Sequence, residues 1–335
     1  MNGSGTEQDP WQVATYAQLA KVARGYDLDD DEYYEPTEHY KLVADIDASP
    51  SETANWNEGD QRYDGWTPLP AFGGVFDGAG HSITGLYINR PNADGQGLFG
   101  PCGDAGAVFR DLALLDVDIV CGRIAGSLAA TVIGNSDGDF SPRVERIYVS
   151  GTMHVVHDGI INASGGIVGV IQHDTVLEDC VSHLIMTTDL SASNILYRGG
   201  VVGRVRHSSV VQRCYATGRT SEPDRADTGS VVGFISDGGA VEDCFYDINA
   251  YEQGETINDD KAVGKTTAEM QDIDTYTNVS NADLDNAWDM VLLSAHDGEQ
   301  ETATWYIDDG NDYPRLWFEY VADEGAPMPQ YIYGE

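Results

Sequence analysis

One stretch of sequence occurs three times in this chain, and no gap is needed to align the copies. They read "SGGIVGVIQHDTVLEDCVSHL", "RGGVVGRVRHSSVVQRCYATG" and "TGSVVGFISDGGAVEDCFYDI". Each copy carries a glycine at one shared position, namely Gly169, Gly203 and Gly233. Each carries a cysteine at a second shared position, namely Cys180, Cys214 and Cys244. Repeats of this length are typical of units that stack because none can bury its own apolar face. The chain is therefore predicted to be a solenoid.

The repeats have the composition of β-strands. Short apolar runs such as "GGVVGRV" and "SVVQRCYA" are rich in valine, are bounded by glycine, aspartate or serine, and lack a helical period. Strands that recur in the same order, each above its predecessor, form an all-β parallel β-helix. Leucine-rich repeats are disfavoured because no L-x-x-L-x-L pattern occurs, and a propeller would need a four-stranded meander in each unit. Weaker copies upstream place Gly100 with Leu112, and Ala130 with Ile147, in the two shared positions.

Several of these segments resemble a known repeat family. "GVFDGAGHSITGLYI" (residues 74–88), "GQGLFG", "GGIVG", "EDCVS" and "QRCYATG" look like GLUG-motif repeats. Those repeats occur in bacterial and archaeal surface proteins and adhesins, and the resemblance implies a right-handed parallel β-helix. It covers residues 11–320 and is specific for architecture, not for activity. The sequence departs from the motif at "AGSLAAT", where Ala130 replaces the usual glycine and leaves the register of that rung open.

The repeats are flanked by segments of a different character. Residues 1–40 are predicted to hold an N-terminal cap helix over residues 15–24, begun by a Thr15–Gln18 capping box, and an acidic loop. The β-helix is assigned to residues 41–263, a C-terminal α/β cap to 264–320 and a tail to 321–335. Within the C-terminal cap we expect a short helix from Thr266 or Thr267 through Met270. "TATWYIDDGNDYPRLWFEY" is expected to form two strands around an Asp-Gly turn.

Acidic residues dominate the charge of the chain. Asp plus Glu number 56 against 18 Lys plus Arg, which gives a formal net charge of −38 at pH 7. Self-repulsion of this kind opposes compaction in dilute buffer and is screened in concentrated salt. The composition therefore favours a protein of a halophile, with an acidic extracellular protein as the alternative. No basic surface is evident for nucleic acid, and no apolar run reaches the length of a membrane-spanning helix.

Stacking turns each position of the repeat into a column of side chains. The column before the cysteine position alternates in sign, reading Asp111, Arg146, Asp179, Arg213, Asp243. Opposite charges on neighbouring strands attract and like charges repel, so this column is predicted to fix the register of the rungs rather than to bind a ligand. The cysteine column is expected to hold buried free thiols, although the spacing between strands would also permit a disulfide. An odd total of five cysteines argues against a disulfide framework.

Two further columns carry candidate binding residues. The first reads His173, His207, Asp237, which are plausible ligands for a transition metal, but a solvated turn explains them better and no cofactor or metal is expected. The second follows the cysteine position and is predicted to form an aromatic outer face that stacks on sugar rings, through Tyr148, Tyr215, Phe245 and Tyr246. Packing of Tyr215 and Phe245 under a loop is the competing interpretation.

The sequence predicts a non-catalytic surface protein that binds a host-cell glycan or glycoprotein and assembles into a homo-oligomer, as a trimer or pentamer, with other structural subunits. "MNGSGTEQDPW" does not resemble a secretory signal. The expected setting is therefore the surface of a virion, as a turret, spike or tail fibre of a virus with a halophilic host. A secreted cell-surface adhesin whose signal was removed is the alternative. A β-helix polysaccharide lyase or hydrolase also stays open, although no Ser-His-Asp, H-E-x-x-H or P-loop motif is present.

Overall fold

The computed structural model describes residues 1–26, 33–34, 37–103, 106–156, 161–189, 195–220, 228–250, 262–280, 283–295 and 303–320. The predicted tail and most of the predicted acidic loop lie outside these residues. The chain divides into two compact units, Met1–Gly264 and Lys265–Glu335, and each is described by itself.

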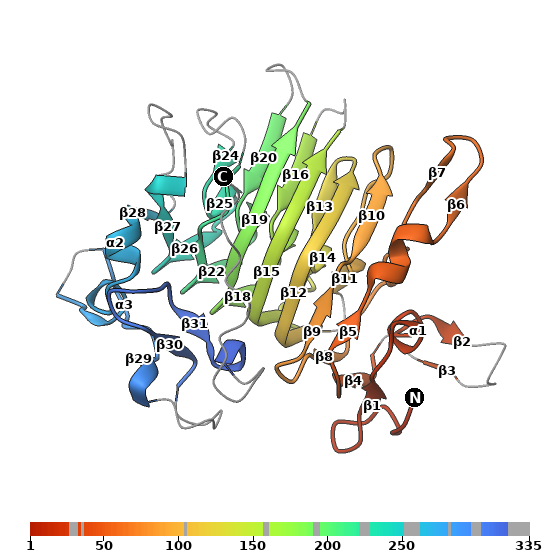
Figure 1. Ribbon diagram of the computed structural model, residues 1–335, viewed down its shortest axis with the longest axis horizontal. Helices are drawn as coiled ribbons and strands as arrows, with labels where there is room; N and C mark the ends of the chain where they lie inside the picture. The colour runs from red at the N-terminus through yellow and green to blue at the C-terminus, as the bar shows by residue number, and fades with distance from the viewer. Residues whose placement is uncertain are drawn as a thin grey trace. The chain divides into compact units, whose positions relative to one another are not determined.

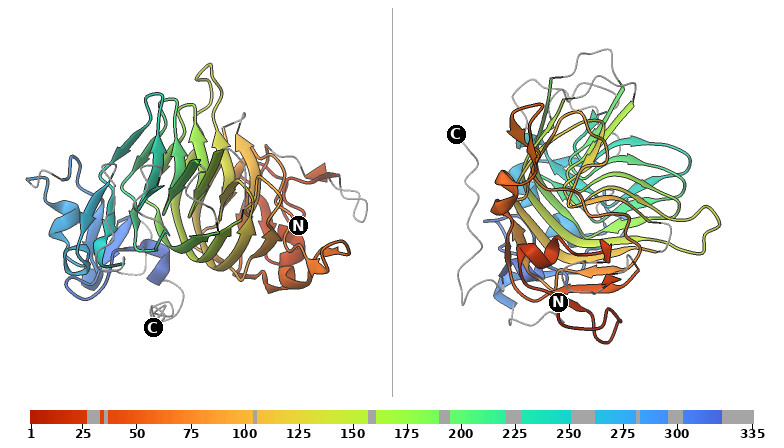
Figure 2. Two further views of the ribbon diagram at one scale, coloured as in Figure 1. Left: turned by 90° about the horizontal axis from the view of Figure 1, so that it is seen from above. Right: turned by 90° about the vertical axis from the view of Figure 1, so that its right-hand side faces the viewer.

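The first unit is a parallel β-helix in which successive copies of the repeat lie side by side (Figures 1 and 2), so the predicted fold class is confirmed. Its long sheet runs in the order β1 (Trp11–Val13), β4 (His39–Leu42), β8 (Val75–Asp77), β12 (Val108–Cys121), β15 (Arg143–Val155), β19 (Val181–Thr188), β23 (Tyr215–Ala216), β27 (Phe245–Asp247). Shorter strands pair beside this path, namely β5 (Ile46–Asp47), β9 (Ser82–Thr84), β10 (Tyr87–Arg90), β18 (Val176–Glu178), β22 (Val210–Gln212), β26 (Ala240–Glu242).

Two further parallel sheets complete the coil. The five-stranded sheet contains β11 (Phe99–Gly103), β14 (Ala129–Ile133), β17 (Val168–Gln172), β21 (Val202–Val205), β25 (Val232–Ile235). The four-stranded sheet contains β13 (Ile124–Gly126), β16 (Ile161–Gly165), β20 (Ile195–Gly199), β24 (Thr228–Gly229). From β13 onward, each rung passes through the four-stranded sheet, turns at a glycine corner into the five-stranded sheet, and then enters the long sheet. The equivalent positions of the three copies pair directly, as Val168 with Val202 and Val202 with Val232 show.

In the three copies that align without gaps, the close approach of the two smaller sheets requires the glycine of the repeat. A Cβ atom on Gly203 would lie 2.6 Å from the backbone nitrogen of Ser164 and 2.7 Å from the carbonyl oxygen of Gly169. A Cβ atom on Gly233 would likewise lie 2.5 Å from the backbone nitrogen of Arg198. Ala130 occupies the same position in β14 without a shift of register, because its neighbours Ala129 and Thr131 pair in step with β11 and β17.

Apolar side chains fill the interior of the coil. In the early rungs the filling is aromatic, with ring centroids of Phe72, Phe99 and Phe109 separated by 4.9 to 5.4 Å. In the later rungs the interior positions are mostly valine, as at Val202 and Val232, which are fully buried. β-Branched side chains pack well on a pleated surface, which explains why the repeats are rich in valine.

The N-terminal segment differs from its prediction in two respects. β1 pairs in parallel with β4, so the coil begins at Trp11 rather than at the predicted residue 41. Helix α1 (Tyr16–Leu19) is capped by Thr15, whose hydroxyl accepts a hydrogen bond from the Gln18 N–H, but the expected extension to residue 24 is wrong. The backbone turns at Ala23, which has a φ of 56°. A short helix gains most of its stability from packing. In this segment the helix ends early, and Leu19 and Val22 are both buried.

The remaining elements of the first unit are short. They are β2 (Gly25–Tyr26) paired with β3 (Tyr33–Tyr34), η1 (Ser49–Thr53), β6 (Trp56–Asn57) paired with β7 (Arg62–Tyr63), and η2 (Ile248–Ala250). Strand β28 (Val263–Lys265) spans the boundary between the two units.

The second unit is a small α/β structure. Its elements are α2 (Thr267–Met270), α3 (Asp274–Thr277), β29 (Met290–Leu292), η3 (Leu293–Ala295), β30 (Trp305–Ile307), β31 (Arg315–Leu316), η4 (Trp317–Tyr320). The predicted short helix is confirmed, with Thr266 and Glu269 forming a capping box. The two strands expected around the Asp-Gly turn are also confirmed, because β30 and β31 pair antiparallel. No helix in the described part of the chain is both long enough and apolar enough to cross a membrane.

Candidate functional site

The alternating charges lie at a left-handed corner of the coil. All five residues of this column have φ between 49° and 55°, a conformation that favours glycine, asparagine and aspartate; they are Asp111, Arg146, Asp179, Arg213, Asp243. The corner separates the short strands of the long sheet, such as β18, from the longer ones, such as β19. The column therefore marks a bend that these five rungs repeat.

Two arginines of this column bind the aspartate of the preceding rung. Arg146 Nε lies 2.6 Å from Asp111 Oδ1, and Arg213 Nε lies 2.9 Å from Asp179 Oδ1. Glu178 also binds Arg213. Burial lowers the pKa of Arg146 and Arg213, but hydrogen bonds and the charge of the neighbouring carboxylates outweigh it and raise both. Because the carboxylates are nearly buried, a one-rung slip would leave them unpaired, which supports a role in fixing the register.

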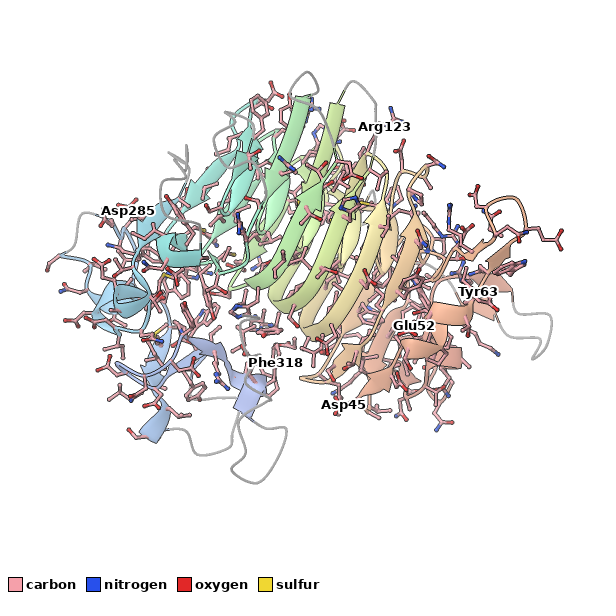
Figure 3. The ribbon with its side chains drawn as sticks, turned by 45° about the horizontal axis from the view of Figure 1, so that its top comes forward. Asp45, Glu52, Tyr63, Arg123, Asp285 and Phe318 are labelled. Carbon is pink, nitrogen blue, oxygen red and sulfur yellow. The ribbon has the colours of Figure 1, made fainter. Side chains whose placement is uncertain are left out.

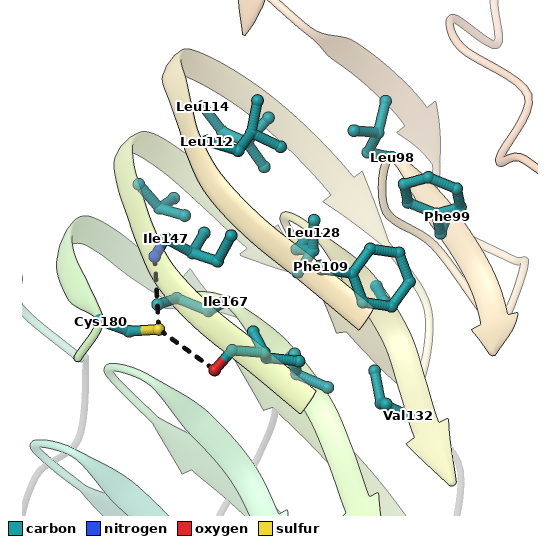
Figure 4. Close-up of a cluster of buried hydrophobic side chains, with 14 of the residues drawn as sticks. Leu98, Phe99, Phe109, Leu112, Leu114, Leu128, Val132, Ile147, Ile167 and Cys180 are labelled. Carbon is teal, nitrogen blue, oxygen red and sulfur yellow. Dashed lines mark hydrogen bonds between the residues drawn. The ribbon is translucent and has the colours of Figure 1, made fainter. Parts of the chain in front are cut away.

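The cysteine column lies on the inside of the same corner. The described cysteines are free and buried, and Cys180 and Cys214 are fully buried. The backbone N–H of Ile147 points to Cys180 Sγ at 3.4 Å (Figure 4), and the N–H of Cys214 points to Cys244 Sγ at the same distance. A left-handed residue turns the next N–H out of the strand ladder, and the sulfur of the following rung accepts it. Burial raises the pKa of the Cys214 thiol, which makes that group a poor nucleophile.

The predicted exposed aromatic face is wrong, because its residues are covered. Tyr148 and Tyr246 are each 7% exposed, Tyr215 is 1% exposed and Phe245 is 0% exposed. The rings of Tyr148 and Tyr215 lie against His183, with centroids 5.2 and 5.8 Å away. Tyr246 belongs to the apolar core. The repeat pattern assigns each residue to one side of its strand, but it does not reveal what covers that side.

The histidine column forms a stacked turn. The rings of His173 and His207 are parallel to within 15°, with centroids 4.4 Å apart, and Asp237 Oδ2 lies 3.6 Å from His207 Nε2. Arg206 Nη2 approaches the same His207 nitrogen at 3.0 Å. Among the described residues no group of three or more His, Cys, Asp and Glu side chains is arranged to hold a metal ion. The fold thus brings the three candidate metal ligands together, but the guanidinium of Arg206 lies against the His207 nitrogen that would have to bind the metal.

An exposed aromatic pair outside the repeats lies on the β6–β7 hairpin. Trp56 and Tyr63 face each other across the two strands, 4.9 Å apart at an interplanar angle of 67°. Trp56 is 50% exposed and Tyr63 is 38% exposed, and Figure 3 shows Tyr63 at the margin of the unit. The pair lies outside the repeats, so no column reveals it. The sequence signal is the segment "WNEGDQRY", with an aromatic residue on either side of a polar turn.

Polar side chains hold this hairpin in shape. The side-chain oxygen of Asn57 accepts hydrogen bonds from the N–H groups of Gly59 and Asp60, which closes the turn. Arg62 forms ion pairs with Asp60 at 2.8 Å and with Asp64 at 3.3 Å. The aromatic rings are therefore presented by a turn that is already ordered, next to carboxylate and amide groups that can bind hydroxyls.

Stacked rungs in register, left-handed corners and glycine corners place the chain among the parallel β-helix proteins. No family model matches it. It is 30% identical over 184 residues to halomucin of Haloquadratum walsbyi, an alignment that covers 53% of this chain and 2% of halomucin. It is 34% identical over 140 residues to a protein of Evansella cellulosilytica that bears the provisional name of Gly-rich membrane protein, covering 41% of this chain and 14% of that protein. The chain thus spans a small part of the length of these curated relatives.

A solved structure of similar fold was found. It is a Bacteroides ovatus protein with the provisional description of an immunoglobulin A1 protease, and it superposes with a TM-score of 0.54. The match covers 80% of this chain and 88% of that chain at 17% sequence identity. A likeness at this identity shows the fold alone.

Proposed function

We propose that this chain is a non-catalytic β-helix segment of a cell-surface protein, built from GLUG-like repeats, and that it binds sugars through the β6–β7 hairpin. The similarity to halomucin and to a Gly-rich membrane protein supports a surface location and favours a cellular setting over a virion. The acidic composition suits a surface bathed in concentrated salt. Adhesion to a host glycan or glycoprotein and assembly into a homo-oligomer belong to the same proposal.

The exposure of Trp56 is the observation that carries sugar binding. A tryptophan that is 50% exposed leaves much of its apolar face in water, whereas the other tryptophans in the described core are at most 9% exposed. Aromatic faces stack on the apolar faces of sugar rings, and the flanking groups of Asn57, Asp60 and Asp64 can bind the hydroxyls. The ordered turn lowers the entropy lost on binding.

A non-catalytic role is supported by the use of the carboxylates in the coil. Asp111, Asp179 and Glu178 bind arginines of neighbouring rungs, so they serve the register of the coil. Glycoside cleavage needs two carboxylates about 5–9.5 Å apart that face a substrate. A lyase, hydrolase or protease is the alternative, and incubation with oligosaccharides and with immunoglobulin would reveal it as product formation.

Glycan-array binding of the labelled chain in molar NaCl tests the proposed site. Trp56→Ala should weaken binding at least about tenfold, because removal of a central aromatic contact costs more than about 1.4 kcal/mol. Trp56→Tyr should retain part of the affinity. Ile185→Ala is the matched control, since Ile185 is 48% exposed on β19 of the same unit and should not matter. Equal binding by Trp56→Ala and the parent would exclude the hairpin as the sugar site.

A further inference from the structure

Basic side chains gather on one outer patch of this acidic protein. Arg204 lies in β21, and Arg206 and His207 follow at the turn that leaves the five-stranded sheet. His173 stacks on His207 from the neighbouring rung. Arg204 shares its column with Val170 and Phe234, and both of these are partly exposed, so the column faces outward. We call Arg204, Arg206, His173 and His207 the basic cluster.

Arg204 packs against aromatic rings, as many ligand-binding arginines do, and not against a carboxylate of the described residues. Its guanidinium carbon lies 5.2 Å from the ring centroid of Tyr197 and 5.6 Å from that of Phe234. Those two rings stack 4.4 Å apart, which fixes the arginine against an aromatic platform. Among the described residues no carboxylate forms an ion pair with Arg204, and its only hydrogen bond there is a long one of 3.5 Å from Nη2 to Ser236 Oγ. Within the described part of the chain, the charge of Arg204 is therefore not paired with a carboxylate.

Arg206 brings a second guanidinium to the same patch. Its one ion pair in the described structure is to Asp237 Oδ2, at 3.5 Å, and half of the Asp237 side chain is exposed. That pair is made by the Nε atom of Arg206, whereas the Nε atom of Arg204 and the Nδ1 atom of His207 are buried without hydrogen-bond partners among the described residues. Among the described residues, two guanidinium groups face one half-exposed carboxylate, so the cluster has more positive charge and more donors than carboxylates to pair with them.

We propose that the basic cluster binds the carboxylate or sulfate group of an acidic sugar. A metal ion is disfavoured there, because the Arg206 guanidinium approaches the His207 nitrogen that would have to bind it. Guanidinium groups bind carboxylate and sulfate oxygens through paired hydrogen bonds, and they stay charged at every relevant pH. The partly exposed ring of Phe234 lies beside Arg204 and offers an apolar contact for the sugar ring. This site is separate from the Trp56–Tyr63 hairpin and takes a charged ligand instead of a neutral one.

Titration calorimetry of the full chain over a series of NaCl concentrations tests the proposal. The ligands are oligogalacturonate for the carboxylate, a heparin-type oligosaccharide for the sulfate, a neutral dextran oligosaccharide and inorganic sulfate. At least one acidic oligosaccharide should bind more tightly than the neutral one and than inorganic sulfate. The Arg204→Gln Arg206→Gln variant should bind it at least about tenfold more weakly, because charge-assisted hydrogen bonds are lost.

Two further variants separate ligand binding from folding. Asp237→Asn removes the competing carboxylate and should tighten binding of the acidic sugar several-fold, a gain that a misfolded protein cannot show. Arg123→Gln is the matched control, since Arg123 is an exposed arginine paired with Asp94 elsewhere on the coil, and it should change nothing. The proposal is overturned if no acidic sugar binds, if inorganic sulfate binds as tightly, or if both cluster variants match the parent. Loss of neutral-sugar binding in Trp56→Ala tests only the hairpin.

Discussion

At the scale of single residues, backbone conformation decides which side chains the repeat can use. Aspartate tolerates the left-handed corner at Asp111 and Asp179, whereas arginine pays a steric cost there. At Arg146 and Arg213 the ion pair to the preceding rung offsets this cost. The alternation of charge is therefore tied to the geometry of the bend.

The glycine corner makes a sharp prediction at this scale. Gly203→Ala should lower the free energy of unfolding by about 1–3 kcal/mol or more, because its Cβ atom meets backbone atoms of β16 and β17 that cannot move aside. Urea unfolding followed by circular dichroism measures the change. Ala130→Gly, at the same position of an earlier rung, should cost no more than about 1 kcal/mol. A Gly203→Ala variant as stable as the parent would show that the sheets can separate without cost.

At the scale of elements, repetition reveals strands and local chemistry reveals caps. The stacking of the cysteine column and the capping box at Thr266 followed from the sequence, because both depend on spacing alone. The residue at which α1 ends and the burial of Tyr215 could not be predicted from the sequence. Each depends on which other segment of the chain packs against it. The Trp56–Tyr63 hairpin was missed since it occurs once, and only its exposure in the folded chain distinguishes it.

The 3₁₀ element η4 holds a titratable group whose behaviour can be measured. Burial raises the pKa of Glu319 to about 8, although the hydrogen bond from the Leu316 N–H and the nearby Arg315 act to lower it. The folded state therefore holds a proton that the unfolded state loses above about pH 4.5. Stability should fall by up to about 1.4 kcal/mol per pH unit as the pH rises from about 5 to 7.5.

Tryptophan fluorescence reports this transition, because Trp288 and Trp305 lie in the core of the same unit. Glu319→Gln keeps an acceptor for the Leu316 N–H but cannot ionise, so its stability should lack this slope. The difference in slope between the parent and Glu319→Gln isolates the group from the histidines. If the stability of the parent and of Glu319→Gln changed with pH in the same way, ionisation of Glu319 would not destabilise the folded state.

At the scale of the whole molecule, two kinds of electrostatics act in opposite directions as salt is added. A net charge of −38 destabilises the compact chain, and added salt screens this repulsion over a distance that falls from about 10 Å at 0.1 M to about 3 Å at 1 M. The ion pairs of the corner column are attractive, but their carboxylates are nearly buried and are screened far less. Repulsion should therefore weaken more than attraction, and salt should stabilise the fold.

The free energy of unfolding should consequently rise between 0.1 M and 3 M NaCl, as urea titrations at each salt concentration would show. Salt also strengthens apolar burial by exclusion from the surface, so the charge contribution has to be isolated. The variant Asp118→Asn Glu242→Gln removes two exposed carboxylates of the coil. It should exceed the parent in stability at 0.1 M by a few tenths of a kcal/mol for each charge and converge with it at 3 M. Equal stability of the two proteins at 0.1 M would mean that the acidic surface does not oppose folding, and the salt-loving character inferred from composition would lose its physical basis.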